Sequence, residues 1–77
     1  MTEQRVVIDC LGHACPIPVL RLAKAAEEAS PGTLIELLSD DAAAKVDIPV
    51  WTRMKHQEFV GREDRARGWA FLVRVIG

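Results

Sequence analysis

The chain passes from its first predicted strand to its first predicted helix through Asp9-Cys10-Leu11-Gly12-His13-Ala14-Cys15-Pro16-Ile17-Pro18. The β-branched run Arg5-Val6-Val7-Ile8-Asp9 that leads into this stretch is typical of a strand. A helical pattern follows Cys15 directly, and Pro16 suits the first helical position, where an N–H would lack a helical partner. We therefore expect a strand–loop–helix unit with Cys15 as the N-cap residue.

A cysteine at the start of a helix lies in an electrostatic setting that favours its thiolate. Helix N-termini carry partial positive charge and free N–H donors, and cysteines placed there can have pKa values lowered to roughly 3.5–7.5. Pro16 and Pro18 have no N–H, so the first-turn amides that could face the sulfur are those of Ile17 and Val19. The pattern favours a nucleophilic or sulfur-carrying Cys15. The alternative is that Cys15 packs as a small hydrophobic residue, as free cysteines often do.

Length and composition limit the class of protein. The chain has 77 residues, which predicts a single domain over residues 1–77 with little core to spare. Hydrophobic residues make up 49% and charged residues 27%, a globular balance that argues against disorder. The net charge of −1 argues against nucleic-acid and membrane-surface partners. No apolar run approaches the roughly 20 residues that span a bilayer.

The cellular compartment is predicted from the N-terminal sequence and the cysteines. Met1-Thr2-Glu3-Gln4-Arg5 lacks the basic and apolar blocks of a signal peptide. Two cysteines without an export signal are typical of reduced thiols in the cytoplasm. We therefore expect a cytoplasmic protein without a structural disulfide.

The first half of the chain predicts a βαβ unit. A helical period runs from Pro16 to Ala29 and is stopped by Ser30-Pro31-Gly32. The segment from Thr33 to Ser39 is predicted to be the second strand, parallel to the first through a right-handed crossover. The expected apolar face of the helix carries Val19, Leu22, Ala23 and Ala26.

The segment after the second strand is ambiguous. Its alanines favour a helix from near Asp41, but Pro49 would then lie inside the helix and break its hydrogen bonds. We therefore predict a loop with at most one turn over residues 40–46. A second helix is expected from Ile48 to His56, with Asp47 as N-cap and Pro49 in the first turn. The side chains expected to point inward are those of Val50, Trp51 and Met54.

The last third of the chain predicts an antiparallel hairpin. A third strand begins at Glu58-Phe59-Val60, a polar turn covers Glu63 to Gly68, and a fourth strand covers Trp69 to Ile76. The expected fold is α/β (α+β): a two-layer βαβαββ sandwich with two helices on one face of a four-stranded mixed sheet. The other face of the sheet would stay open, where residues of the last strand could meet a partner.

The other chemically active side chains have several interpretations. Cys10, His13 and Cys15 lie within six positions, but a zinc site needs four ligands and His56 is the only further soft candidate, so no metal is expected. Cys10 could resolve a persulfide or disulfide on Cys15 if the Cα atoms lie within about 7 Å. Packing at the strand end is the favoured interpretation of Cys10. His13 could lend a proton or positive charge to Cys15, or simply face solvent.

The predicted hairpin tip and the tryptophans are assigned structural roles. We expect the tip to be a solvated turn, and a docking surface is the alternative. The tryptophans are expected in or near the core, because no stacking platform surrounds them. The tip residues are Arg62, Glu63, Asp64, Arg65 and Arg67, and the tryptophans are Trp51 and Trp69.

The pattern Asp9-x-x-Gly12-x-x-Cys15-Pro16-x-Pro18 resembles the signature of the TusA/SirA-like family of small sulfur-carrier (sulfurtransferase) proteins. The resemblance spans nearly the whole chain in order and spacing. It implies the same βαβαββ sandwich that the residues predict. Its further segments are Asp40-Asp41, Asp47-Ile48-Pro49 and Phe71-Leu72-Val73-Arg74.

The resemblance also implies a function. In this family the cysteine of the Cys-Pro-x-Pro motif, here Cys15, accepts sulfane sulfur as a persulfide from a cysteine desulfurase or rhodanese-like donor. It passes the sulfur to an acceptor protein, as in tRNA thiolation, molybdenum-cofactor assembly or sulfur oxidation. No other cofactor is implied, because the cargo is bound covalently to the carrier. Such transfer needs a cysteine that is ionised and exposed.

Two features bear on partner and mechanism. Ala14 stands where the best-known relay member has arginine, and Ile17 replaces an acidic residue, so the choice of partner stays open.

A thiol redox protein that uses Cys10 and Cys15 is one rival function. A non-catalytic binding or regulatory module, in which Cys15 merely packs, is the other.

Overall fold

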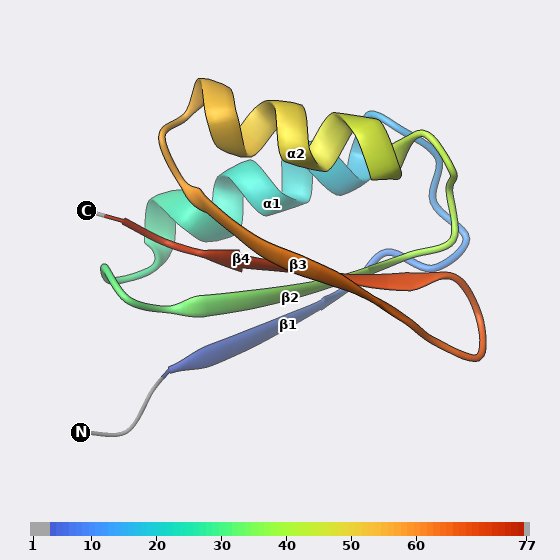
Figure 1. Ribbon diagram of the computed structural model, residues 1–77, viewed down its shortest axis with the longest axis horizontal. Helices are drawn as coiled ribbons and strands as arrows, with labels where there is room; N and C mark the ends of the chain where they lie inside the picture. Colours follow the sequence, from blue (N-terminus) through green and yellow to red (C-terminus); the bar gives the residue numbers. More distant parts are fainter. Residues whose placement is uncertain (1–3, 77) are drawn as a thin grey trace.

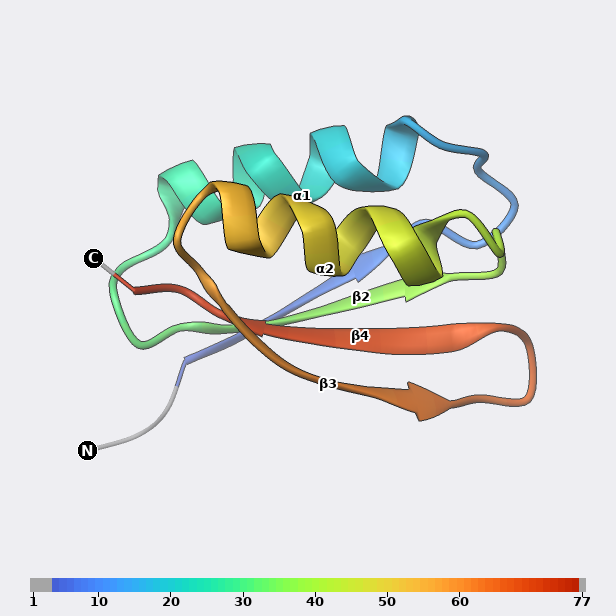
Figure 2. The ribbon, with the colours of Figure 1, turned by 45° about the horizontal axis from the view of Figure 1, so that its top comes forward.

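The computed structural model describes residues 4–76. The elements follow the order βαβαββ, and both helices cover the same face of one sheet (Figures 1 and 2). This confirms the predicted class of a two-layer α+β sandwich. The elements are β1 Arg5–Asp9, α1 Ile17–Glu28, β2 Leu34–Ser39, α2 Ala44–Met54, β3 Glu58–Asp64 and β4 Trp69–Arg74.

The sheet is mixed, as expected, with strand order β1-β2-β4-β3. β1 is parallel to β2, with Ile8 opposite Leu37, and α1 forms the crossover between them. β4 is antiparallel to both β2 and β3. Because β1 and β2 run in the same direction, the loops that follow them leave the sheet at the same edge (Figure 2). This arrangement brings residues 10–16 close to residues 40–43.

The core lies between the sheet and the helices. Successive strand residues point to opposite faces of a sheet, so alternate positions of β2 and β4 face the helices. The two helices each contribute a large aliphatic side chain to the same core. The residues at its centre, all fully buried, are Ile35, Leu37, Phe71, Val73, Leu22 and Ile48.

The second helix begins earlier than predicted. α2 starts at Ala44, and Pro49 lies inside it, so the predicted loop and the N-cap role of Asp47 are wrong. The N-cap is Ala43, and no side chain caps the helix. Asp41 holds the turn that leads into it: its Oδ1 accepts the Ala43 N–H at 3.1 Å and its carbonyl accepts the Ala44 N–H at 3.0 Å. Pro49 removes a single N–H from the helical hydrogen-bond pattern. The preceding alanines and this turn outweigh that loss.

The buried face of α2 also differs from the predicted one. Ala44, Ile48 and Thr52, spaced four residues apart, face the core. Val50 is 45% exposed and Met54 is 67% exposed, so their predicted inward orientation is wrong. The earlier start of the helix adds Ala44 to the row that includes Ile48, and this row packs on the sheet. The partial burial expected of Trp51 and Trp69 is confirmed.

The hairpin turn is shorter than predicted. β3 continues to Asp64, so Glu63 and Asp64 are strand residues that pair with Ala70 and Trp69. The turn is confined to residues 65–68, and β4 ends at Arg74, two residues before the predicted end. Backbone pairing therefore includes two acidic residues that the charge pattern assigned to a loop.

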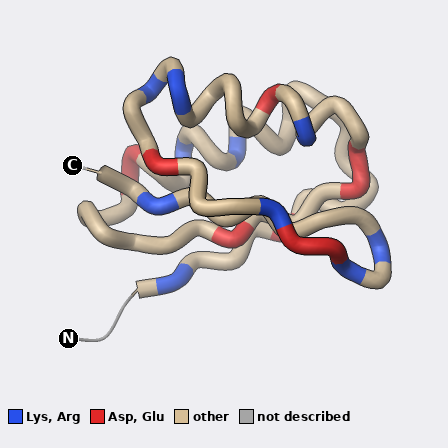
Figure 3. The backbone as a smooth tube through the Cα atoms, viewed as in Figure 1, with Lys and Arg blue, Asp and Glu red and all other residues tan. Residues whose placement is uncertain are grey.

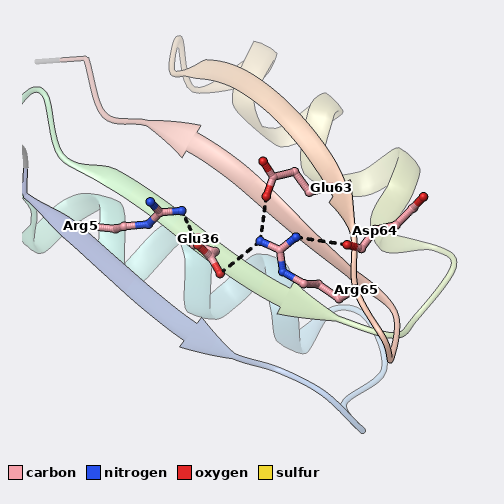
Figure 4. Close-up of polar contacts among 5 residues, drawn as sticks. All are labelled: Arg5, Glu36, Glu63, Asp64 and Arg65. Carbon is pink, nitrogen blue, oxygen red and sulfur yellow. Dashed lines mark hydrogen bonds and ion pairs between the residues drawn. The ribbon is translucent and has the colours of Figure 1, made fainter.

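The face of the sheet opposite the helices carries a network of ion pairs (Figure 4). Arg65 turns back from the hairpin and pairs with Glu63 at 2.7 Å and with Glu36 at 3.7 Å. Glu36 also pairs with Arg5 from the edge strand. Leu72, opposite Glu36 in the sheet, is only 9% exposed. This part of the open face is therefore covered by the protein's own side chains, and Arg65 is not a free tip residue.

Charges of both signs are interleaved over helices and sheet (Figure 3). The two signs nearly balance, in agreement with the net charge of −1. None of the helices within residues 4–76 has the length and apolar character needed to cross a bilayer.

Candidate functional site

The site forms where the loops after β1 and β2 meet. The first loop carries Cys10, His13 and Cys15, and the second carries Asp40 and Asp41. Their proximity follows from the parallel pairing of β1 with β2. Functional groups in α/β proteins commonly gather at the carboxyl ends of parallel strands.

Cys15 lies one residue outside its predicted position. The N-cap of α1 is Pro16, with φ −93° and ψ 13°, and the helix begins at Ile17. The Ile17 N–H donates to the Ala14 carbonyl at 3.1 Å, so this amide is engaged by backbone and does not serve the sulfur, contrary to expectation. Further along the first turn, Pro18 is buried. Cys15 itself is partly buried and packs against the edge of the core.

The groups that face Cys15 are carboxylates. Its backbone N–H donates to Asp41 Oδ2 at 2.7 Å. The negative charges of Asp47 and Asp41 act on its thiol. Burial raises the pKa of the Cys15 thiol to about 12, and the hydrogen bond and negative charge of Asp47, then Asp41, act in the same direction. The lowered pKa expected from the helix N-terminus is therefore wrong: in the free protein Cys15 is a thiol.

Asp40 clamps the middle of the cysteine loop. Its Oδ1 accepts the Gly12 N–H at 3.0 Å, and its Oδ2 accepts Arg67 Nε at 2.9 Å. Gly12 has φ +84°, a conformation that favours glycine. Arg67 of the hairpin turn thus holds Asp40, and Asp40 holds the loop. Arg67 is exposed, as expected of a solvated tip, and its ion pair with Asp40 adds a structural role that was not predicted.

Cys10 is a core residue. It is fully buried, and its N–H extends the β1–β2 pairing by donating to the Leu38 carbonyl at 2.8 Å. Burial raises the pKa of the Cys10 thiol, and Arg21, with Nη1 at 3.8 Å from Sγ, opposes that shift. The favoured interpretation, packing at the strand end, is confirmed. A resolving role would require the side chain to leave the core.

His13 is exposed, and the charges that act on the Cys15 thiol come from Asp47 and Asp41. The solvent-facing interpretation of His13 therefore describes the free protein. Within residues 4–76, no group of three or more His, Cys, Asp or Glu side chains is placed to hold a metal ion.

The sequence interpretation missed the chemical role of Asp41 and Asp47. Both belong to segments that carry the family resemblance, but neither was assigned to the cysteine. A usable signal was present: two predicted parallel strands place Asp41 and Cys15 at the same edge of the sheet. Asp47 could not be placed, because the start of α2 was predicted too late.

Acidification is expected to weaken the hydrogen bonds by which Asp40 and Asp41 hold the cysteine loop. The Gly12 and Cys15 N–H groups hold the pKa values of Asp40 and Asp41, respectively, below the usual range. A carboxylate with a lowered folded-state pKa stabilises the fold above its unfolded pKa of about 3.9, and the contribution disappears as the pH falls through the folded-state value. We expect the urea midpoint of the wild type to fall below about pH 4.

Urea unfolding measured from neutral to acidic pH checks this prediction. Asp40→Asn and Asp41→Asn should each flatten the acid limb of the stability curve, whereas Asp64→Asn, on the hairpin, should not. Acid limbs that coincide in all four proteins would contradict the assignment.

Comparisons with known proteins agree with this architecture. A family model described as "Sulfurtransferase TusA" matches residues 6–75. Two proteins of Archaeoglobus fulgidus, each named "Putative sulfur carrier protein", are 44% identical over 70 residues and 30% identical over 71 residues. The alignments cover 90% of this chain and 91% of the first relative, and 92% and 97% for the second. The crystal structure of a SirA-like protein from Desulfitobacterium hafniense superposes with a TM-score of 0.78 at 25% identity, covering 94% of this chain and 97% of the other.

Proposed function

The chain belongs to the TusA family of sulfurtransferases, and on this premise we propose that it carries sulfane sulfur as a persulfide on Cys15 from a donor protein to an acceptor protein. The choice of Cys15 over Cys10 rests on one observation. Of the two cysteines, Cys10 is fully buried, whereas Cys15 is partly exposed on a surface loop. A second protein can reach Cys15 without unfolding the carrier. The burial of Cys10 also argues against a redox pair of the two thiols.

The proposed loading step is a thiol–persulfide exchange. The Cys15 sulfur, as thiolate, attacks the outer sulfur of a donor persulfide, R–S–SH. A new S–S bond forms at Cys15, the S–S bond of the donor breaks, and the donor leaves as a thiolate that takes up a proton. The net result is Cys15–S–SH and R–SH, with no external oxidant or reductant. Unloading is the same exchange, with an acceptor thiol attacking the outer sulfur.

The surroundings of Cys15 support contact with another protein. Ile17 and Leu20, on the first turns of α1, are 41% and 58% exposed. Val46 and Val50, on α2, which packs beside α1, are also exposed. Apolar side chains grouped at a surface are typical of protein contact sites. The reactive sulfur therefore lies beside a surface on which a partner can dock.

The partners follow from this chemistry. The donor must itself hold a persulfide, which favours a cysteine desulfurase or a rhodanese-like protein. The acceptor serves a pathway that consumes sulfane sulfur, such as tRNA thiolation, molybdenum-cofactor assembly or sulfur oxidation. The carrier needs no further cofactor, because the sulfur is its cargo. A free thiol at Cys15 requires a reducing compartment, so we place the reaction in the cytoplasm.

Chemical release of the sulfur tests the proposal. The wild-type protein is incubated with a cysteine desulfurase and sulfur-labelled cysteine, separated, and treated with cyanide. A persulfide should release its outer sulfur as labelled thiocyanate and leave the Cys15 thiolate. Dithiothreitol should release the same label as sulfide. Label that resists both reagents, or protein that stays unlabelled beside a donor shown to be active, would contradict the proposal.

A further inference from the structure

The cysteine loop, residues 10–16, is fixed by hydrogen bonds more than by packing. None of residues 11–17 is buried, although Cys15 is partly so. Two backbone N–H groups fasten the loop to the segment that follows β2. Gly12 donates to Asp40 Oδ1 at 3.0 Å, and Cys15 donates to Asp41 Oδ2 at 2.7 Å. The position of Cys15 therefore depends on how firmly these two carboxylates are held.

The two carboxylates are held from different parts of the chain. Asp41 is fixed within its own loop: its Oδ1 accepts the Ala43 N–H at 3.1 Å, and its N–H donates to Ser39 Oγ at 3.2 Å. Asp40 is fixed from the hairpin turn, because its Oδ2 accepts Arg67 Nε at 2.9 Å. One oxygen of Asp40 thus holds the cysteine loop while the other is bound by Arg67.

The hairpin turn is itself placed firmly against this region. Its ends are joined by the hydrogen bond from the Arg65 N–H to the Gly68 carbonyl at 3.1 Å. Gly68 lies so close to the Ser39 carbonyl oxygen that a Cβ would be 2.3 Å from it. Arg67 Nη2 would lie 3.6 Å from a Cβ at Gly12, so the guanidinium also lies beside the cysteine loop. Arg67 therefore connects a well-anchored turn to the loop that carries the reactive sulfur.

We propose that Arg67 is a positioning residue for sulfur transfer: through Asp40 it fixes Gly12, and with it the place at which the cysteine loop presents Cys15 to a donor protein. Because a donor protein is part of it, this inference rests on the proposed function. A persulfide held in a protein arrives at a set place, and attack is efficient only when the reacting atoms are aligned. Arg67 acts through Asp40 and does not contact the transferred sulfur.

The rate of loading by a cysteine desulfurase and labelled cysteine tests this inference, with the donor in excess over the carrier. The variants are Arg67→Ala, Asp40→Asn and the double variant. An asparagine keeps an oxygen for the Gly12 N–H, but its amide nitrogen cannot accept a hydrogen bond from Arg67. Arg65→Ala is the matched control: it removes the same charge from the same turn, and its ion pairs lie on the open face of the sheet. Circular dichroism verifies that each variant is folded.

The expected effects are modest and specific. The Arg67 side chain is 65% exposed, and an exposed ion pair changes an equilibrium by about two- to fivefold. We expect Arg67→Ala to load about two- to fivefold more slowly than the wild type, and its Gly12 amide to exchange hydrogen faster by a similar factor. The double variant should be no slower than the slower single variant, because the two residues act as one unit. Arg65→Ala should match the wild type in both measurements.

A small reagent separates position from reactivity. Iodoacetamide can approach the sulfur from any accessible direction, so it does not require the loop to hold Cys15 in one place. Alkylation of Cys15 in Arg67→Ala should therefore be no slower than in the wild type. Equal slowing of alkylation and of loading would overturn the inference, because the effect would then lie in the reactivity of the thiol.

Other results would also overturn the inference. Folded Arg67→Ala that loads at the wild-type rate, or whose Gly12 amide exchanges as in the wild type, would show that Arg67 does not fix the loop. A double variant slowed by the product of the two single effects would show that Arg67 does not act through Asp40. Equal slowing in Arg65→Ala would assign the effect to the lost charge. A wild type that takes up no sulfur from an active donor would instead refute the proposed function, and the exchange of the Gly12 amide would still report whether Arg67 holds the loop.

Discussion

The Cys15→Ser variant is expected to take up no sulfur from a cysteine desulfurase, because a serine hydroxyl cannot attack a sulfane sulfur under these conditions. A Cys10→Ala variant should load as completely as the wild type. Cys10 is fully buried, and its backbone rather than its thiol continues the sheet pairing. The measurement is labelled sulfur retained by each purified protein.

The choice of control matters for this comparison. Alanine is preferred to serine at Cys10, because burying a hydroxyl in the core costs free energy unless it is well hydrogen-bonded. Cys15 is partly exposed, so serine should leave the fold intact, and a urea titration checks this. Equal loading of Cys15→Ser and wild type, or loss of loading in folded Cys10→Ala, would contradict the assignment of the carrier to Cys15.

Gly68→Ala is expected to have the largest effect on stability. Gly68 has φ +75°, and a Cβ there would lie 2.3 Å from the Ser39 carbonyl oxygen and 2.7 Å from Asp40 Cα. Both are backbone atoms, which cannot move without displacing the loop that holds Gly12. Backbone strain and overpacking together predict a loss of about 3–5 kcal/mol. That is a large share of the roughly 4–12 kcal/mol expected for a domain of this size.

Substitutions at two other glycines separate the effect of backbone strain from that of close packing. Gly32 has φ +92°, and a Cβ added there would have no atom within 4 Å, so Gly32→Ala should cost only the strain of a left-handed residue, about 1–2 kcal/mol. Gly61 has neither a positive φ nor a close neighbour, and Gly61→Ala should be nearly neutral. Urea unfolding of the three variants provides the ranking. A Gly68→Ala protein as stable as Gly32→Ala would refute the close-packing argument.

The elements that could be predicted are those with strong local signals. β1 has the predicted bounds, Arg5–Asp9, and α1 differs by one residue at each end. The β-branched run marks the strand, and Ser30-Pro31-Gly32 marks the end of the helix. The topology could be predicted because a strand, a helix and a strand in succession favour a parallel right-handed unit.

The start of α2 could not be predicted from local signals. Pro49 is a strong helix breaker by itself, and the turn that leads into the helix is held by hydrogen bonds to Asp41. The effect of a proline in a helix depends on whether the missing hydrogen bond is offset by packing, here by burial of Ala44 and Ile48. That balance is a tertiary property.

The reactive residue was predicted, but its electrostatic setting was not. A cysteine before Pro16 indicates a helix start, and helix starts favour anions. In the structure the Asp41 carboxylate accepts the Cys15 backbone N–H, and the negative charges of Asp47 and Asp41 act on the thiol. Burial, followed by the hydrogen bond and negative charge of Asp47 and by those of Asp41, outweighs the partial charge of a helix end and raises the pKa of the thiol. Both acidic residues lie far along the chain from Cys15, so only the fold brings them together.

The most direct test of the central claim is to locate the added sulfur within the loaded wild-type protein. Cleavage after Arg5 and Arg21 yields one peptide that contains both Cys10 and Cys15. After loading by a cysteine desulfurase and alkylation, fragmentation between the two cysteines separates them. We predict one extra sulfur atom on the fragment with Cys15. Extra sulfur on Cys10, or a peptide that lacks two hydrogens because the cysteines form a disulfide, would contradict the account.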